Sequence, residues 1–453
     1  MPIPPEHSYR LAYHFTLLDN LPGIISGGLL APNEQRRQNV AHRSIAEESI
    51  QARRSRMPVT CGPGGVVHDY VPFYFTSLSP MLQAVINAKN VDQHDLIHLA
   101  VPVTLLDRPE VVFTNAAANA SQPPAFYTDP LHLKNLRWDL IDPQRWKWTS
   151  EEKHLRMAEM LVHSAISLTD VSHIIVWNEG MKKKVEDIFA AANVVPLPIE
   201  FSGHRRTNHY FTTFWNPKSN VSIVTGPKEI YRTYKSAVEY IASEGFSANG
   251  QFPNLRKMLK ALRLDLAALP ETAELVGLES ENDMHREDVG NHTLSVVRNL
   301  RASPEFLALS ENDQMLIEIA AYFHDIGKGP KERWADKGGK QQVDPNHPVG
   351  GLIMLVRILT QEVALMKQRS ARVICKLVCY HDLVGDIFGK GRDPKQLEDI
   401  VETEAELDML IALGLADMRS VNPRWADGRG DEIAELRARV LTKLNAGEPE
   451  DEE

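Results

Sequence analysis

Histidine and aspartate side chains in the second half of the chain have the residue types and the settings of metal ligands. His324 and Asp325 are adjacent at the end of an apolar run, and Asp417 lies inside another apolar run, where a charge needs a partner. One such histidine is usually a core residue, but several together with two aspartates are hard to explain in that way. Imidazole and carboxylate groups suit divalent ions, and two such ions can activate water and hold a phosphate. The candidate ligands are His292, His324, Asp325, His347, His381 and Asp417.

A second stretch, residues 53–81, combines cations, a turn and an aromatic segment. It begins with three arginines, continues through the turn-forming run CGPGG, and leads into an aromatic and β-branched segment that predicts a strand over residues 66–75. Pro72 within that segment predicts an edge or irregular strand. Arginines beside a glycine-rich turn and an aromatic strand suit a ligand with phosphates and flat rings, although a surface loop beside a half-buried strand explains the same residues.

Glu159 stands in the apolar run MAEMLV, residues 157–162, which predicts the start of a helix or a strand. A glutamate at such a position is costly to bury without partners. A solvent-facing position on an amphipathic element explains the residue equally well.

Hydrophobic periodicity divides the chain into parts that would position these groups. Short strands with scattered helices predict an α+β domain over residues 1–212. Residues 213–282 predict a helical connector, or the first helices of the next domain. Helical spacing without a clear strand predicts an all-α domain over residues 283–447, and residues 448–453 form an acidic tail that we expect to be disordered.

Composition is that of an ordinary globular protein of 453 residues with a net charge of −10. The first 210 residues carry 20 Lys and Arg against 21 Asp and Glu, and the remainder carries 30 against 39, so nucleic acid is expected to bind the first half. The arginines between Arg36 and Arg56 would form a local phosphate-binding patch, unless they belong to a solvated helix face. Cys61, Cys375 and Cys379 give no disulfide framework, and no apolar run spans a bilayer, which favours the cytoplasm and no membrane partner.

The first half resembles the DarT family of DNA ADP-ribosyltransferases. The resemblance depends on HDYVPFYF (residues 68–75) followed by SPM (residues 79–81), and on pieces that occur in the same order along residues 9–211. These pieces are YHFT (residues 13–16), DNL (residues 19–21), GGLL (residues 27–30), RSI (residues 43–45), IQARR (residues 50–54) and RMAEMLV (residues 156–162). The resemblance implies NAD⁺ as the substrate that donates ADP-ribose, DNA, most often single-stranded, as the acceptor, and a role as a toxin in defence against phage.

The same resemblance implies the site residues. Arg54 and Glu159 match the catalytic arginine and glutamate, and His14, Thr16 and Tyr74 match the NAD⁺-binding residues. A carboxylate beside the ribose would stabilise the oxocarbenium-like transition state. Two departures from the family pattern, Leu78 in place of an arginine and NAA at residues 115–117 in place of Asp-Gly-Asn, put the contacts to diphosphate and target in doubt. Trp146 and Trp148 stand among cations and suit base stacking, with a buried tryptophan as the alternative.

The second half resembles the HD superfamily of metal-dependent phosphohydrolases over residues 283–444. His292, His324, Asp325 and Asp417 match its minimal pattern, and His347 and His381 match the extra histidines of members with two metals. Lys328 matches a lysine near the substrate phosphate. The resemblance implies one or two divalent ions (Mn, Fe, Zn or Mg) and a possible nucleotide ligand.

Together these features predict a two-part enzyme: an ADP-ribosyltransferase that modifies DNA bases, joined to an HD domain that regulates it or hydrolyses a phosphate ester. One alternative is a phosphohydrolase whose first half only binds NAD⁺ or nucleic acid. The other is a nucleic-acid-binding sensor with both sites inactive. The oligomeric state, the modified base and the metal are left open by the sequence.

Overall fold

The computed structural model describes residues 2–118, 123–143, 148–201, 208–212, 221–281 and 287–446. Contacts divide the chain into two compact units, Met1–Val224 and Thr225–Glu453. The expected α+β first half and helical second half are confirmed. Trp146 and the acidic tail at residues 448–453 lie outside the described residues.

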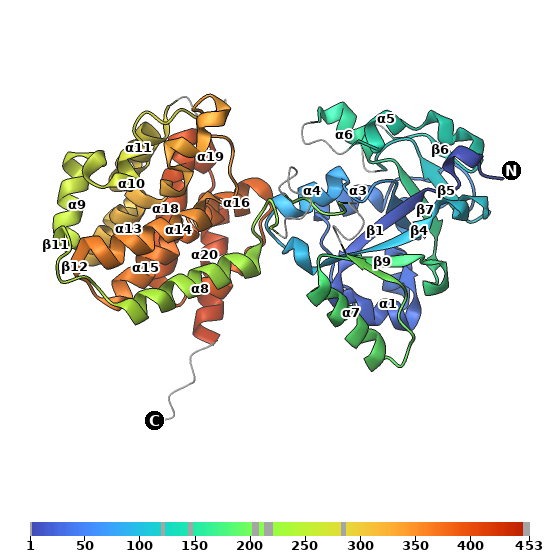
Figure 1. Ribbon diagram of the computed structural model, residues 1–453, viewed down its shortest axis with the longest axis horizontal. Helices are drawn as coiled ribbons and strands as arrows, with labels where there is room; N and C mark the ends of the chain where they lie inside the picture. The colour runs from blue at the N-terminus through green and yellow to red at the C-terminus, as the bar shows by residue number, and fades with distance from the viewer. Residues whose placement is uncertain are drawn as a thin grey trace. The chain divides into compact units, whose positions relative to one another are not determined.

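A mostly antiparallel eight-stranded sheet forms the centre of the first unit (Figure 1). Its strand order is β10-β9-β4-β1-β3-β7-β5-β6, and only β9 and β10 pair in parallel. The strands are β1 (Leu11–Leu17), β3 (Tyr70–Tyr74), β4 (Leu96–Pro102), β5 (Val111–Thr114), β6 (Phe126–Tyr127), β7 (Glu159–His163), β9 (His173–Val176) and β10 (Ile199–Phe201), with β2 (Leu29–Leu30) and β8 (Ala165–Ile166) as a separate pair. Strands β4 and β7 are buried along nearly their whole length, which suits a sheet covered on both faces.

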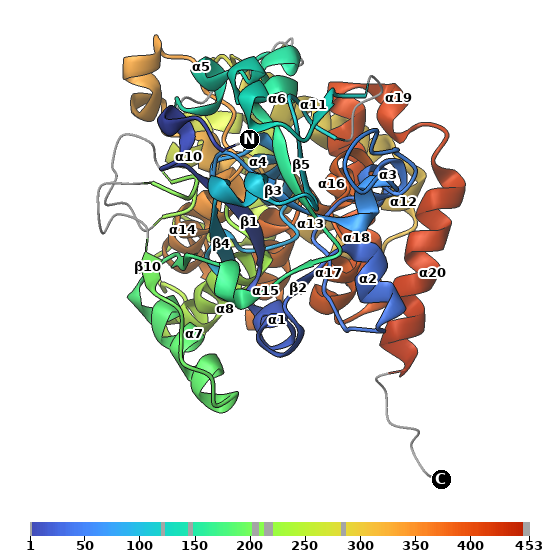
Figure 2. The same ribbon diagram turned by 90° about the vertical axis from the view of Figure 1, so that its right-hand side faces the viewer.

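Short helices surround this sheet. They are α1 (Leu21–Gly27), α2 (Pro32–Arg37), α3 (Glu48–Arg54), α4 (Pro80–Asn87), α5 (Trp138–Ile141), α6 (Ser150–Arg156) and α7 (Glu179–Ala191). Within this unit, α5 and α6 lie at one end and α1 and α7 at the opposite end (Figure 2). A capping box begins α6, since Thr149 Oγ1 accepts from the Glu152 amide while the Glu152 carboxylate accepts from the Thr149 amide.

Pro72 predicted an edge or irregular strand. Strand β3 is not an edge strand, because it lies between β1 and β7, but its pairing is irregular on the β1 side. The strand tolerates proline there because its pairing with β1 is limited to Tyr13 opposite Tyr74, whereas its pairing with β7 runs the length of the strand. Because β1 does not pair with β3 at position 72, no ladder hydrogen bond is needed there from an amide hydrogen, which proline lacks. The Pro72 carbonyl is consequently left to accept a hydrogen bond from a side chain, His14.

The second unit is a helical bundle with one continuous apolar core. Its helices are α8 (Pro227–Glu244), α9 (Leu255–Leu264), α10 (Pro270–Ala273), α11 (Val289–Ala302), α12 (Pro304–Leu307), α13 (Glu311–Phe323), α14 (His347–Arg357), α15 (Gln368–Cys379), α16 (Leu383–Lys390), α17 (Lys395–Ile400), α18 (Glu404–Val421), α19 (Pro423–Ala426) and α20 (Gly430–Ala446). Helix α18 is buried on nearly every side from Leu407 to Ala416, as a central helix requires.

Two features of this unit differ from a simple all-α domain after a connector. Helices α8 and α9, in the stretch 213–282, contribute Ile230, Tyr234 and Met258 to the core, so they pack as the first helices of the unit. A short parallel pair, β11 (Phe252–Asn254) and β12 (Val363–Leu365), joins them to the bundle. Among the described residues, no helix has both the length and the apolar character needed to cross a membrane.

Candidate active sites

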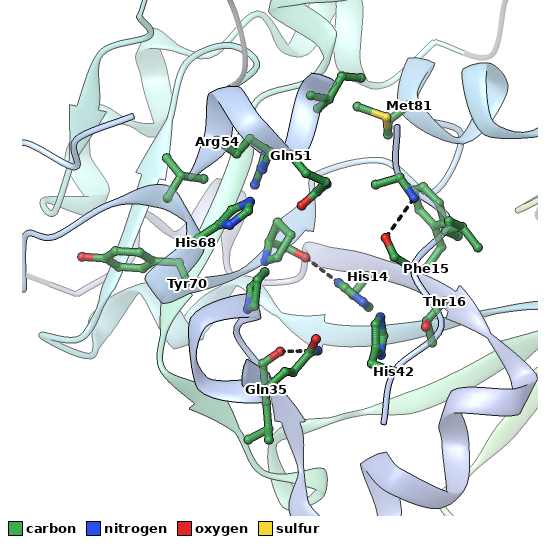
Figure 3. A pocket seen from close by; sticks show the side chains of 18 of the residues that line it. His14, Phe15, Thr16, Gln35, His42, Gln51, Arg54, His68, Tyr70 and Met81 are labelled. Atoms are coloured by element: carbon green, nitrogen blue, oxygen red, sulfur yellow. Dashed lines mark hydrogen bonds between the residues drawn. The ribbon is translucent and has the colours of Figure 1, made fainter. Parts of the chain in front are cut away.

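A cavity of about 340 Å³ in the first unit is lined by residues from β1, β3, α2, α3 and α4. Four of the sequence-predicted site residues line it, namely His14, Thr16, Arg54 and Tyr74. Figure 3 shows His14 and Thr16 on one side of the cavity and Arg54 on another. Strand β1 and the end of α3 therefore meet at one cavity although they are far apart in the sequence.

Arg54 and Glu159 form a buried, bidentate ion pair. The Arg54 Nη1 and Nη2 atoms lie 2.9 Å from Glu159 Oε1 and 2.9 Å from Oε2, and the two residues are 6% and 1% exposed. Burial alone would lower the pKa of Arg54, but the charge and hydrogen bonds of Glu159 outweigh it and raise that pKa. The fork of the guanidinium matches the carboxylate edge, so the pair is fixed in orientation as well as in charge.

The Glu159 carboxylate is positioned by the sheet and by one loop. Glu159 is the first residue of β7 and lies directly opposite Tyr74 on β3. Its backbone amide donates to Thr114 Oγ1 at 3.1 Å. The Ala118 amide also donates to Glu159 Oε1 at 3.1 Å. The residues that depart from the family pattern at 115–117 thus belong to the loop that holds the glutamate, a connection the sequence did not predict.

Arg156 fixes the segment in front of Glu159. It is 2% exposed, and its Nη1 donates to the Ile141 carbonyl at 2.7 Å while its Nη2 donates to the Leu78 carbonyl at 3.2 Å. Its guanidinium lies 4.6 Å from the centre of the Trp148 ring. Leu78 itself packs in the apolar core, so this position supplies no charge to the cavity.

His14 presents an acceptor to the cavity. Its Nδ1 lies 2.9 Å from the Pro72 carbonyl oxygen, which can only accept, so Nδ1 carries the hydrogen and Nε2 carries the lone pair. Burial lowers the pKa of His14 to about 4, which keeps the ring neutral at physiological pH. Thr16 is held by Asn20, whose amide donates to Thr16 Oγ1 at 2.9 Å and pairs with the backbone of Arg43.

Most of the predicted arginine patch is not at the cavity. Arg36 and Arg54 line it, whereas Arg37 pairs with Glu34 on the same helix and Arg43 faces Asp19. Sequence reasoning did not single out His42, Gln51 or His68, which also line the cavity; His68 lies within HDYVPFYF and was available as a signal.

Acid should destabilise the first unit, because four of its histidines have lowered pKa values in the folded state. Burial is the main cause that lowers the pKa of His14, His68 and His209 to about 4 and that of His98 to about 3. The unfolded chain takes up protons first, near pH 6.5, so this contribution is complete above that pH and is lost as the pH falls towards 4. We expect the thermal midpoint of the full chain, measured by calorimetry, to fall between pH 7 and pH 5.

His98→Phe should make that fall smaller, since His98 is fully buried beside the rings of Phe15 and Tyr210. A wild-type thermal midpoint that is the same at pH 7 and pH 5 would contradict the predicted loss of stability in acid.

In the second unit, the six sequence-predicted metal ligands converge. His292 Nε2 lies 3.4 Å from His324 Nε2 and 3.1 Å from Asp417 Oδ1. His347 Nε2 lies 3.1 Å from His381 Nε2 and 3.1 Å from Asp325 Oδ1. Helices α11, α14 and α18 and the ends of α13 and α15 supply these groups.

Asp325 belongs to both halves of this cluster. Its Oδ2 lies 3.3 Å from His324 Nε2 and 3.5 Å from His292 Nε2, while its Oδ1 faces His347. Two ligand groups result, one of His292, His324 and Asp325 and one of Asp325, His347 and His381. A carboxylate that offers one oxygen to each group is the arrangement expected for a bridge between two ions.

All four histidines have their lone pairs directed into the cluster. The Nδ1 atoms of His324, His347 and His381 lie 2.7, 2.8 and 2.8 Å from backbone carbonyls, to which they can only donate. His292 Nδ1 lies 3.0 Å from Ser420 Oγ, whose hydroxyl is used to donate to the Asp417 carbonyl, so this Nδ1 also donates. Facing Nε2 lone pairs would repel one another without a cation, so this donor set fits divalent metal.

The pKa values of residues in the cluster also fit a site for a divalent metal. Burial would raise the pKa of Asp325, but Lys328 and His324 outweigh it and hold that pKa well below its usual range. Burial is the main cause that lowers the pKa of His381 to about 4, so its ring is neutral, as a ligand must be. Burial would also lower the pKa of His324, but the carboxylates of Asp325 and Asp417 outweigh it and raise that pKa, so these carboxylates favour positive charge at the cluster. Lys328 Nζ lies 2.7 Å from Asp325 Oδ2 and so pairs with one of the candidate ligands. Ser420 is a further contributor that the sequence did not reveal.

Comparison with known proteins gives one family match for each unit. The family described as "ssDNA thymidine ADP-ribosyltransferase, DarT" matches residues 13–211, and the HD domain family matches residues 289–413. The first match includes Arg54 and Glu159. The second includes the candidate ligands of the second unit except Asp417.

Individual relatives match the first half. A DNA ADP-ribosyl transferase of Thermus aquaticus is 37% identical over 40% of this chain and 81% of its own length. One from Thermus sp. is 35% identical over 38% of this chain and 84% of its own length. A solved structure of Thermus sp. 2.9 DarT in complex with ADP-ribosylated ssDNA is 31% identical, covers 44% of this chain and 97% of that chain, and has a TM-score of 0.40.

Proposed function

The chain belongs to the DarT family of DNA ADP-ribosyltransferases through its first unit, and from that membership we propose that this unit transfers ADP-ribose from NAD⁺ to a base of single-stranded DNA. The observation that carries the proposal is the buried ion pair between Arg54, which lines the cavity together with His14, Thr16 and Tyr74, and Glu159, which pairs with Arg54 but is not itself a lining residue.

The roles of these residues follow from the chemistry of transfer. The bond between nicotinamide and ribose breaks, nicotinamide leaves with the bonding electrons, and positive charge develops on the ribose. The Glu159 carboxylate stabilises that charge, and Arg54 holds the carboxylate in place. The lone pair on His14 Nε2 accepts from a ribose hydroxyl, and Tyr74 offers a ring face to nicotinamide. The DNA base attacks the ribose carbon, forms the new bond there, and releases its proton to water.

The test is to incubate the purified full-length chain with labelled NAD⁺ and, in parallel, single-stranded DNA, duplex DNA, RNA and a protein. We expect label on single-stranded DNA, and only on oligonucleotides that contain thymidine, the target in the family description. Label on RNA or protein alone, or none, would reject the proposal and favour a first half that only binds NAD⁺ or nucleic acid.

For the second unit we propose a metal-dependent phosphohydrolase site of the HD type with two divalent ions. The bridging position of Asp325 between two ligand groups supports it. When bound, the ions would activate water and hold a phosphate. The chain's own residues fix the geometry: four backbone or hydroxyl acceptors set the histidine tautomers, and Lys328 balances the charge of Asp325.

The compartment that suits both activities is the cytoplasm, where DNA and NAD⁺ meet. Cys61, Cys375 and Cys379 are all free thiols, in keeping with a reducing environment. A sensor with both sites inactive would need neither the intact Arg54–Glu159 pair nor the converging imidazoles.

A further inference from the structure

The His68 side chain is a buried hydrogen-bond donor at the cavity. It is 4% exposed and lines the cavity of the first unit. Its Nδ1 lies 3.1 Å from Arg36 Nη2. A guanidinium can only donate, so His68 Nδ1 must accept, and the neutral ring then carries its hydrogen on Nε2. Within the described part of the chain, this Nε2 has no hydrogen-bond partner.

A relay of hydrogen bonds behind the ring fixes this tautomer. Arg36 Nη2 also donates to Asn33 Oδ1 at 2.8 Å, and Asn33 Nδ2 donates to Asp69 Oδ1 at 2.6 Å. The other carboxylate oxygen of Asp69 accepts from the Val66 amide at 2.8 Å. The orientation of the imidazole is therefore set by groups outside the cavity.

The glycine-rich turn makes this relay possible. Gly65 has a φ of +79°, and a Cβ at that position would collide with Asp69 Oδ2. The turn that sequence analysis associated with a phosphate-bearing ligand thus acts indirectly, by letting Asp69 anchor the relay.

The ring stays neutral, which makes Nε2 a donor rather than part of a cation. Burial, then the charges of Arg54 and Arg36, lowers the pKa of His68 to about 4. Most buried polar groups have a protein partner, so a donor that lacks one and lines a cavity is available to a ligand. Figure 3 shows the His68 ring beside Arg54, the residue to which NAD⁺ chemistry is assigned.

We propose that His68 is a further NAD⁺-binding residue, whose Nε2–H donates a hydrogen bond to an oxygen of the dinucleotide beside Arg54. This inference rests on the proposed function of the first unit and names one contact within it. None of the described protein groups accepts from this donor, and bound NAD⁺ would supply an acceptor, so part of the affinity would come from this hydrogen bond.

Two variants with the same chemical group but different reach test the contact. The amide nitrogen of His68→Gln reaches the position of Nε2, whereas the amide of His68→Asn reaches only the position of Nδ1. NAD⁺ binding to the full-length chain is measured by calorimetry without DNA. We expect His68→Asn to weaken binding roughly tenfold and His68→Gln to remain within about threefold of wild type. His132→Asn, a histidine that does not line the cavity, should bind as wild type does.

The outcomes separate this inference from the function on which it rests. Wild type that does not bind NAD⁺ rejects both. Wild type that binds, with His68→Asn equally tight or with both variants equally weak, rejects the contact alone and leaves His68 a structural role. ADP-ribose as a second probe locates the oxygen: a loss seen with both ligands assigns it to the ribose or phosphates, and a loss with NAD⁺ only assigns it to the nicotinamide carboxamide.

Discussion

Glu159→Gln should reduce the labelling of single-stranded DNA by about 100-fold or more, the usual effect of removing one group that stabilises transition-state charge. The amide keeps the shape of the carboxylate, and its oxygen can still accept from the Ala118 amide. What it lacks is the negative charge opposite the developing positive charge of the ribose. Labelled NAD⁺ and a thymidine-containing oligonucleotide measure the loss.

The structure also predicts a cost in stability that the sequence did not indicate. The sequence reveals no partner of Glu159, so from the sequence alone Glu159→Ala would be expected to fold as wild type does. In the structure its removal leaves the buried Arg54 guanidinium without its counter-charge, and breaking such a buried pair typically costs about 3–5 kcal/mol. Glu159→Ala should therefore lower the thermal midpoint more than Glu159→Gln, which still accepts one hydrogen bond from Arg54.

A matched control separates lost chemistry from lost stability. Glu406, 3% exposed, pairs with the buried Lys376 at 2.7 Å in the second unit. Glu406→Gln should also lower the thermal midpoint, but DNA labelling below the transition should be unchanged. Full labelling by a folded Glu159→Gln chain would remove Glu159 from the catalytic role.

Asp325→Asn should empty the metal centre of the second unit, from about two ions per chain to none. Its two oxygens serve different ligand groups, so one substitution weakens both. His381→Gln removes a ligand from one group only and should leave about one ion. Elemental analysis after reconstitution with Mn²⁺, Fe²⁺ or Zn²⁺ measures these contents.

Asp386→Asn is the control for that experiment, because Asp386 is a buried acid of the same unit that pairs with Lys390 and Arg392 rather than with the cluster. It should keep the metal content of wild type. Retention of both ions by Asp325→Asn would exclude the bridge, and a metal-free wild type after reconstitution would make this unit a scaffold.

The same Asp325→Asn chain decides how the two units are related. Greater DNA labelling than in wild type would mean that the metal site opposes transfer, by removing ADP-ribose or by destroying a signal. Equal labelling would mean that the two sites act independently under those conditions.

The sequence by itself was enough to predict which residues would carry the chemistry. The types and settings of the histidines and aspartates in the second half indicated the six candidate ligands, whereas Arg54 and Glu159 followed only from the family resemblance of IQARR and RMAEMLV. Periodicity was sufficient for the α+β and helical halves, because apolar spacing reflects which face of an element is buried.

Only the tertiary structure decided how these groups meet. Arg54 and Glu159 are 105 positions apart. The β3–β7 register sets the position of Glu159 and the end of α3 supplies Arg54, and no local pattern encodes that these two elements meet. Pro72 predicted an edge or irregular strand from its missing amide hydrogen, and only the sheet shows which of the two applies: β3 is central, and it is irregular because β1 pairs with it at a single register position. The Ala118 amide acts through its backbone, which leaves no trace in residue type. The tautomers of His68 and His292 depend on which nitrogen faces a partner, and that is settled only when distant elements pack together.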